Sequence, residues 1–181
     1  IRHGNRDALV VLRLNANGTL DTGFGSGGFA DLPVPPDTNA QGTALALEPD
    51  GRITVAGLQG GKLVLARLLP AGTLDTTFGT GGTFVWETEI ASYPPPKLVR
   101  AAGGYRVLVH LRRSGTTSSS VFDCRVLAVT AAGAPDATYG SGGVSGDVVV
   151  PAANGSSCEA IGSQRDGRVI VGGNRFGDNV Q

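Results

Sequence analysis

The feature that most constrains this fold is an internal repeat of nine residues. The segment L-D-T-G-F-G-S-G-G at Leu20–Gly28 returns at Leu74–Gly82 and, as P-D-A-T-Y-G-S-G-G, at Pro135–Gly143. Successive copies are offset by 54 and 61 positions. A repeat of this period indicates one supersecondary unit per copy, stacked on its neighbours to bury a shared core. The chain is therefore predicted to be an array of similar units.

Two further motifs recur with the same period. The motif P-D-G-R-I-x-V-A-G at Pro49–Gly57 returns at Arg165–Gly173 and has a degenerate middle copy at Ala102–Val109. The third motif is an apolar run that ends in a turn glycine. Its copies are Leu9–Gly18, Leu63–Gly72 and Cys124–Gly133.

The spacing of these motifs divides the chain into units of unequal length. The extra length falls in Arg112–Ser120, whose small polar residues are typical of an expanded surface hairpin. We place the units roughly at 1–55, 56–108 and 109–181, within a single repeat domain spanning 1–181.

Each unit is predicted to contain about four short strands. In the middle of the chain these strands are Gly42–Glu48, Arg52–Ala56, Lys62–Leu69 and Thr83–Glu89. The pair Asp50-Gly51 between the first two strands predicts a hairpin with a type I′ turn, and Asp166-Gly167 repeats it.

The apolar residues of the third strand point to both faces of its sheet. In Leu63–Ala66 apolar residues follow one another without alternation, and the same holds for Leu9–Leu12. Other sheets must therefore cover both faces, since no segment predicts a long helix. The expected fold is all-β: a β-propeller-like array of about three four-stranded antiparallel blades. A repeated sandwich or a linear array of small sheets is the alternative.

Three blades are fewer than the four to eight that usually close a propeller ring. Alignment of the motifs sets Ile1 against Val55 and Gln181 near Leu65, so both ends fall around the hairpin between the second and third strands. We therefore expect part of a larger or oligomeric propeller. In this hypothesis the ends complete a shared blade with a second copy of the chain or with flanking repeats, and two copies give six blades.

Composition and charge exclude two classes of function. The chain carries 15 basic and 15 acidic residues among 181, so its formal net charge is zero. No apolar run approaches the roughly 18 residues of a membrane helix. We therefore expect neither nucleic-acid binding nor a membrane span. The chain begins with Ile and lacks Met, so we expect a processed chain or part of a longer one.

The two cysteines, Cys124 and Cys158, lie 34 positions apart, which fits neither a metal-ligand pair nor a redox motif. They are either two small buried apolar residues or a disulfide. The disulfide is favoured if the protein is exported.

The motifs together resemble the delta-60 repeat, which occurs in tandem in large bacterial proteins. The resemblance rests on P-D-G-R-I-x-V-A-G, the following apolar strand with A-R-L, and G-T-L-D-T-x-F-G-x-G-G, and residues 49–82 fit it best. The middle copy departs at Gly103-Gly104, and Ala128 stands where the other copies have Arg13 and Arg67. The resemblance implies a β-propeller-like fold and an extracellular or cell-surface location in bacteria. It brings no catalytic residues.

One aspartate recurs in each repeat, and an aromatic residue follows it three positions later. The aspartates are Asp21, Asp75 and Asp136, and the aromatic residues are Phe24, Phe78 and Tyr139. A ring of calcium ligands is one interpretation, but calcium takes six to eight oxygens and these residues recur in separate units. The favoured interpretation is that each aspartate caps a turn leading into an aromatic core residue. Arg13 and Arg67, within apolar strands, are expected to pair with Asp21 and Asp75.

The sequence predicts no catalytic, cofactor-binding or metal site. His3 and His110 are not clustered with other ligands, and no G-x-S-x-G motif occurs. The glycines of the repeat lack the lysine of a phosphate loop. Trp86 and Tyr93 are candidate residues for stacking on a sugar or peptide, although packing of Trp86 between sheets is favoured.

These observations predict a non-enzymatic, extracytoplasmic β-propeller repeat module for protein or glycan binding or for assembly. Its expected partners are other copies of itself, the remaining repeats of a parent chain, or a protein or glycan ligand, and no cofactor is expected. The alternatives are a propeller-type enzyme resembling hydrolases or lactonases, and a structural subunit of an extracellular assembly.

Overall fold

The computed structural model describes residues 2–3, 6–7, 9–32, 40–91, 93–112, 122–140, 147–149 and 156–175. These residues form strands and turns, and none of them is helical. The described part of the chain thus contains no helix of the length and apolarity that crossing a membrane requires. Residues 113–120 of the predicted long loop and residues 141–143 of the third nine-residue motif lie outside the described part.

The strands are β1 (Arg2–His3), β2 (Arg6–Asp7), β3 (Val10–Leu12), β4 (Phe29–Asp31), β5 (Ala40–Leu47), β6 (Ile53–Gln59), β7 (Lys62–Leu68), β8 (Thr83–Glu89), β9 (Lys97–Ala101), β10 (Gly104–Arg112), β11 (Phe122–Thr130), β12 (Asp147–Val149), β13 (Ser156–Ser163) and β14 (Val169–Arg175). Two sheets are complete, with four antiparallel strands each: β5–β8, called blade 1, and β9–β12, called blade 2. Of the three two-stranded sheets among the described residues, two are half-blades: β3–β4, the N-terminal half-blade, and β13–β14, the C-terminal half-blade. β1 and β2 form a separate small hairpin.

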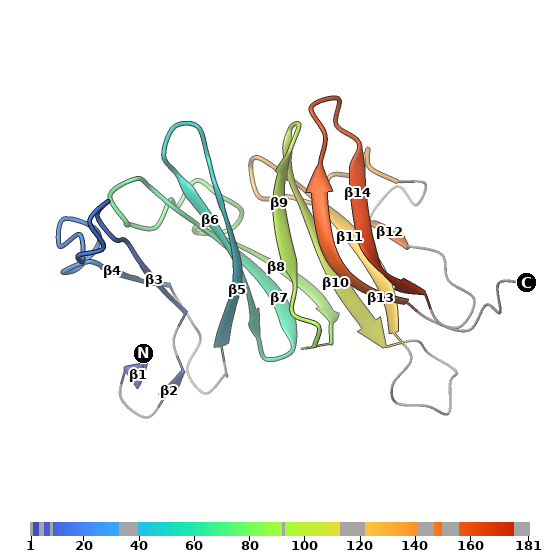
Figure 1. Cartoon of the computed structure of the whole chain (residues 1–181), viewed down its shortest axis with the longest axis horizontal. Coiled ribbons are helices and arrows are strands. Elements are labelled where there is room, and N and C mark those ends of the chain that lie inside the picture. The colour runs from blue at the N-terminus through green and yellow to red at the C-terminus, as the bar shows by residue number, and fades with distance from the viewer. Residues whose placement is uncertain are drawn as a thin grey trace, which may run out of the picture.

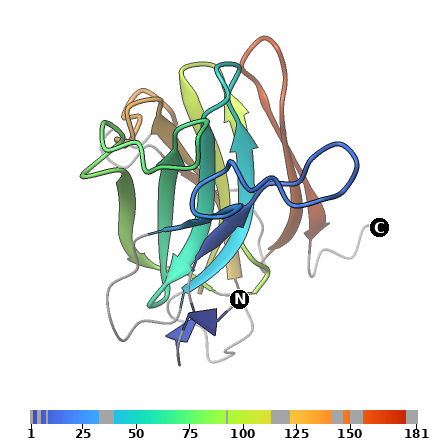
Figure 2. The ribbon, with the colours of Figure 1, turned by 90° about the vertical axis from the view of Figure 1, so that its left-hand side faces the viewer.

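The sheets follow one another in chain order across the molecule (Figure 1). The N-terminal half-blade lies at one end, blades 1 and 2 lie in the middle, and the C-terminal half-blade lies at the other end. Figure 2, which faces the first end, shows β3 and β4 in front of blade 1. The predicted all-β, β-propeller-like array of four-stranded antiparallel blades is confirmed. Two complete blades and two half-blades take the place of the three blades expected.

The hairpins between the first and second strands form where predicted, but the turn type was wrong. Gly51 N–H donates to the Glu48 carbonyl (3.0 Å), and Glu48 N–H donates to the Arg52 carbonyl (2.8 Å). Gly51 has φ +85°. This is a three-residue loop, a type I turn with Pro49 in its second position followed by a left-handed glycine, and not a two-residue type I′ turn. The same bonds recur at Gly167.

Both faces of the central strands of blade 1 are buried, as the unbroken apolar runs predict. Ile53, Val55, Ala66 and Leu68 join a cluster with the N-terminal half-blade. Their neighbours of opposite parity, including Ala56 and Leu65, join a larger cluster with blade 2. Successive side chains of a strand point to opposite faces, so blade 1 is packed between two sheets.

A disulfide links blade 2 to the C-terminal half-blade. Cys124 on β11 and Cys158 on β13 have an Sγ–Sγ distance of 2.09 Å and a Cα–Cα distance of 6.1 Å. Both side chains are buried beside Leu108 and Val126. Closing a loop of this length restricts the unfolded chain and stabilises the fold by about 4 kcal/mol in the loop-entropy model.

Candidate functional site

The most distinctive chemical arrangement in the molecule is an Arg–Asp–aromatic cluster that occurs three times. The aspartate and the aromatic residue of each cluster lie on the loop that contains the nine-residue repeat, between the third and fourth strands of a blade, and the arginine comes from a strand or its end. Its copies are Arg13, Asp21 and Phe24; Arg67, Asp75 and Phe78; and Arg106, Asp136 and Tyr139.

The middle cluster is almost fully buried. Arg67 Nε donates to Asp75 Oδ2 (2.7 Å), and the Arg67 guanidinium lies 4.7 Å from the centre of the Phe78 ring. Asp75 Oδ1 accepts from the Thr77 backbone N–H (3.1 Å) and hydroxyl (2.6 Å). Burial alone would raise the pKa of Asp75, but the Thr77 hydrogen bonds and the Arg67 charge lower this pKa to about 2. Asp75 therefore caps the turn, as expected, and also pairs with Arg67.

The first cluster repeats this geometry in a more exposed setting. Arg13 Nε donates to Asp21 Oδ2 (2.7 Å), and the Arg13 guanidinium lies 4.7 Å from the Phe24 ring centre. Asp21 Oδ1 accepts from Gly23 N–H (3.0 Å). The hydrogen bond from Arg13 is the main cause of the lowered pKa of Asp21. The predicted pairs Arg13–Asp21 and Arg67–Asp75 are both present.

The third cluster takes its arginine from another strand. Ala128 occupies the position of Arg67, but Arg106 lies directly opposite Ala128 in the β10–β11 register. The Arg106 guanidinium lies 4.4 Å from the Tyr139 ring centre, and its Nη2 lies 3.5 Å from Asp136 Oδ2. Asp136 thus keeps an arginine partner, which sequence reasoning missed. The sequence does contain an arginine, Arg106, on the strand that pairs with β11, and the strand register would have placed it opposite Ala128.

The repeated loop of each unit docks onto the turn of the next unit. Gly25 N–H donates to the Ala71 carbonyl (2.8 Å), and Gly79 N–H donates to the Ala132 carbonyl (2.7 Å). A Cβ on Gly133 would lie 2.5 Å from Gly79 N, so only glycine permits this approach. We call this contact the interlock.

The interlock also covers the aromatic residues. A Cβ on Gly72 would lie 2.9 Å from the Phe24 ring, and a Cβ on Gly133 would lie 3.0 Å from the Phe78 ring. Phe24 and Phe78 are fully buried, whereas Tyr139 is only partly buried. The nine-residue repeat therefore holds neighbouring blades together.

A second polar cluster joins blade 1 to blade 2. Thr54 donates to the Tyr105 hydroxyl (2.7 Å), and this hydroxyl donates to Glu48 Oε1. Glu48 Oε2 accepts from Arg100 Nε (2.9 Å). Burial, followed by the Glu48 carboxylate, raises the pKa of Tyr105, so the phenol stays protonated and donates. The sequence identified only a degenerate motif copy at Ala102–Val109 and gave no sign of Glu48 or Thr54, because the contact joins residues more than 50 positions apart.

The hairpin aspartates have a local structural role. Asp50 Oδ1 accepts from Arg52 N–H, and Asp166 Oδ1 accepts from Arg168 N–H, both at 3.1 Å. Each aspartate also forms an ion pair with the arginine two positions later. The hydrogen bond from that arginine is the main cause of the lowered pKa of each carboxyl.

His110 lies buried against the disulfide. Its Nε2 accepts from Cys158 N–H (3.1 Å), and burial lowers its pKa despite the nearby charge of Glu159. One ligand atom each of His110, Cys124 and Cys158 lie within 4.8 Å of one another. Both sulfurs are bonded to each other and not available as thiolate ligands. The side chain of His3 lies outside the described part of the chain.

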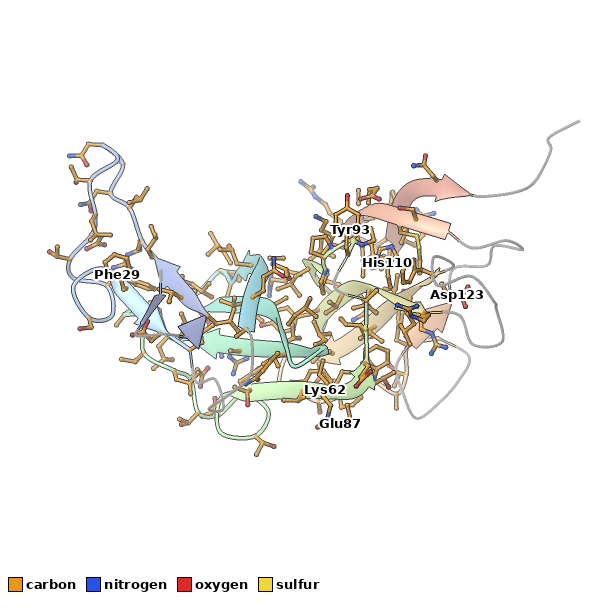
Figure 3. The ribbon with its side chains drawn as sticks, turned by 90° about the horizontal axis from the view of Figure 1, so that it is seen from below. Phe29, Lys62, Glu87, Tyr93, His110 and Asp123 are labelled. Atoms are coloured by element: carbon orange, nitrogen blue, oxygen red, sulfur yellow. A yellow bond between two sulfur atoms is a disulfide. The ribbon has the colours of Figure 1, made fainter. Side chains whose placement is uncertain are left out.

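The two candidate stacking residues have different surroundings. Trp86 on β8 is partly buried and packs against the core cluster between the blades. Tyr93 is 79% exposed, and Figure 3 shows it near His110, well apart from Glu87, the residue after Trp86. Tyr93 alone of this pair presents its ring to solvent.

Large apolar side chains are exposed at both ends of the array. Leu45 and Leu47 on β5 are 54% and 66% exposed, and Leu12 and Leu14 are 47% and 56% exposed. At the other end Ile170 on β14 is 56% exposed. Clustered apolar exposure of this kind marks interaction surfaces.

The fold and the repeated clusters define a repeat protein of the β-propeller type. Residues 2–24 and 48–78 match a family described as a domain of unknown function (DUF5122) beta-propeller. The matched segments hold two copies of the apolar strand and of the start of the nine-residue motif. No curated protein and no solved structure matches the chain.

Proposed function

We propose that this chain is a non-enzymatic, extracytoplasmic bacterial β-propeller repeat module of the delta-60 type that functions by binding and assembly. The geometry favours a protein partner, because four leucines, on β5 and on and after β3, are exposed at the N-terminal end of the array. Tyr93 is the candidate contact for a glycan or peptide ligand, since an exposed aromatic ring stacks on such groups. The hydrolase-like enzyme and the structural subunit stay alternative hypotheses.

The observation that carries this proposal is the exposure of Leu45 and Leu47. On the opposite face of β5, Ala46 is buried against blade 2. Leu45 and Leu47 point the other way, toward the N-terminal half-blade, whose two strands leave them exposed. A surface that is buried between complete blades is thus available to a partner at this end.

The disulfide supports an extracytoplasmic location. Disulfides form and persist in oxidising compartments and are rare in the reducing cytosol. The Cys124–Cys158 bond joins two separate sheets in a buried position, so it contributes to the folded structure itself.

Light scattering across a concentration series tests the binding function. We expect the mass of the native protein to rise above the 18.3 kDa of the single chain. The double variant Leu45→Glu/Leu47→Glu should stay at the mass of one chain, because two charges prevent burial of the surface. Leu69→Glu is the matched control, since Leu69 is also exposed but lies in a turn. Equal masses for all three proteins at every concentration would contradict the proposal.

A further inference from the structure

We infer that the two half-blades are complementary parts of one composite blade formed by two copies of this chain. The C-terminal half-blade of one copy supplies the first and second strands, and the N-terminal half-blade of the other copy supplies the third and fourth. The inference rests on the proposed assembly function and specifies its partner. Strand position, exposed side chains, charge and the interlock support it independently.

The half-blades occupy complementary positions in the repeat. β3 and β4 lie 54 positions before the third and fourth strands of blade 1, and the turn glycines of β13–β14 and β5–β6, Gly167 and Gly51, lie 116 positions apart. Among the described strands, β3 pairs with β4 alone and β14 pairs with β13 alone. β3 thus exposes the edge that β7 presents to β6, and β14 exposes the edge that β6 presents to β7.

The repeat predicts the register between the two copies. In blade 1, Val55 lies opposite Ala66 in the antiparallel β6–β7 pair. The equivalent residues are Val171 on β14 and Leu12 on β3. We therefore expect Val171 of one copy to lie directly opposite Leu12 of the other.

Exposure of apolar residues on the N-terminal half-blade fits this placement. Ala66 and Leu68 are buried in blade 1, whereas their equivalents Leu12 and Leu14 are exposed. The exposed pair would gain valine neighbours from β14 in the composite blade. The leucines lie at the strand edge where an added strand removes apolar surface from water.

The outer face of β14 supplies cover for Leu45 and Leu47. Thr54 in blade 1 faces blade 2 and is fully buried, and its equivalent in β14 is the exposed Ile170. In the composite blade Ile170 faces blade 1 of the second copy, where the two exposed leucines lie. An apolar residue at this position matches an apolar surface.

Charge complementarity supports the same arrangement. In blade 1, Arg52 directly precedes the second strand, and its Nη1 lies 3.6 Å from Asp75 Oδ2 in the cluster beside the third strand. The equivalents are Arg168, whose side chain is exposed in the single chain, and Asp21, whose side chain is partly exposed. The composite blade brings Arg168 of one copy toward Asp21 of the other.

The interlock contacts also support a second copy in this position. A Cβ on Gly18 would meet nothing within 4 Å, whereas its equivalents Gly72 and Gly133 contact the loop of the preceding unit. The loop without such a partner among the described residues is the one at Tyr139 and Gly140. In the composite blade Gly140 N–H of one copy donates to the Asn17 carbonyl of the other, as Gly79 does to Ala132.

The proposed β14–β3 pairing and the proposed Gly140–Asn17 contact both require the second copy in the same position. The described residues of each copy form two complete blades and two half-blades, so those of two copies make six blades, within the four to eight typical of closed rings. A two-fold symmetric pair uses both half-blades of each copy and pairs the free edges of β3 and β14.

Cysteine cross-linking tests the register. The variant Leu12→Cys/Val171→Cys should form a disulfide-linked dimer under mild oxidation, and reductant should reverse it. The matched control is Leu12→Cys/Ile170→Cys, in which a shift of one residue moves the second thiol to the other face of the strand. The Cys124–Cys158 disulfide is the same in both variants. A dimer in both variants to equal extent, or in neither, would overturn the composite blade.

Hydrogen exchange of the native protein provides a measurement that needs no variant. Backbone amides of β3 and β14 should exchange more slowly at concentrations where the mass is doubled than in dilute solution. Amides of the exposed turn at Gly61 should not change. Leucine-dependent assembly without the register-specific cross-link would leave the proposed function standing and refute the composite blade. A mass of one chain at every concentration would refute both.

Discussion

The first and middle Arg–Asp–aromatic clusters have the same chemistry but very different burial. The side chains of Arg67 and Asp75 are 4% and 6% exposed, whereas those of Arg13 and Asp21 are 41% and 27% exposed. Both pairs keep a 2.7 Å ion pair. The difference in burial comes from the second strand of the blade. In blade 1 this strand, β6, lies beside the middle cluster, whereas no second strand pairs with β3 among the described residues. Local sequence therefore sets the geometry of the cluster, and the neighbouring strand sets its energetic weight.

Replacing the arginine of each cluster with alanine should give the largest difference in stability between the two clusters. Arg67→Ala removes the 2.7 Å partner of the buried Asp75 charge, leaves only Arg52 at 3.6 Å, and should lower the free energy of unfolding by about 3–5 kcal/mol. Arg13→Ala breaks a partly exposed pair and should cost less than about 1 kcal/mol. Urea denaturation of both variants measures the difference. Equal losses would show that burial does not set the weight of the pair.

A calcium titration distinguishes the two interpretations of the repeated aspartates, turn capping and calcium binding. With a turn-capping role, Asp75→Ala lowers the melting temperature and leaves the response to calcium unchanged. A calcium-dependent melting shift that disappears in this variant would instead support the ring of ligands.

Alanine substitutions at Gly133 and Gly18 compare a turn inside the interlock with an equivalent turn outside it. Gly133 and Gly18 have φ of +81° and +84°, so alanine strains both positions similarly. Only at Gly133 does the added Cβ meet the neighbouring loop, so Gly133→Ala should cost about 1–3 kcal/mol more than Gly18→Ala. Thermal and urea unfolding in dilute solution measure this difference. The same cost at both positions would mean that the interlock does not restrict the turn.

The pH dependence tests the buried ion pair without removing the arginine. The pKa of Asp75 is lowered to about 2 from 3.8, so its charge stabilises the fold fully above about pH 5. This contribution declines as pH falls through 3.8 toward 2, because the unfolded state takes up the proton first. The difference in unfolding free energy between native protein and Asp75→Asn should be constant from pH 5 to 7 and shrink below about pH 4. A difference that grows toward low pH would contradict the assigned pKa direction.

Much of the blade could be predicted from local patterns. The unbroken apolar runs of β7 and β3 predict sheets that are covered on both faces. The period of the repeat then predicts that these are four-stranded sheets stacked on one another. The Asp50–Gly51 hairpin was predicted, but its turn type was wrong. Pro49 is pre-set for the second position of a type I turn, and with the following left-handed glycine it forms a three-residue loop.

The third cluster shows where local patterns stop. Ala128 stands where the other copies have an arginine, so the motif by itself gives Asp136 no partner. Arg106 takes over because antiparallel pairing sets it opposite Ala128, 22 positions earlier in the chain. The strand register that brings them together is decided by packing of whole strands, so a single motif does not contain it.

The sequence by itself determined the repeating unit, its strands, and the turns that need glycine, because these depend on side-chain periodicity and backbone sterics within a few residues. The tertiary structure decided which arginine meets Asp136, that Cys124 bonds to Cys158, and which copies of one motif are buried. These outcomes depend on contacts between blades. A residue repeated identically along the chain has a different environment wherever the neighbouring sheet differs, and burial then changes the strength of the same interaction.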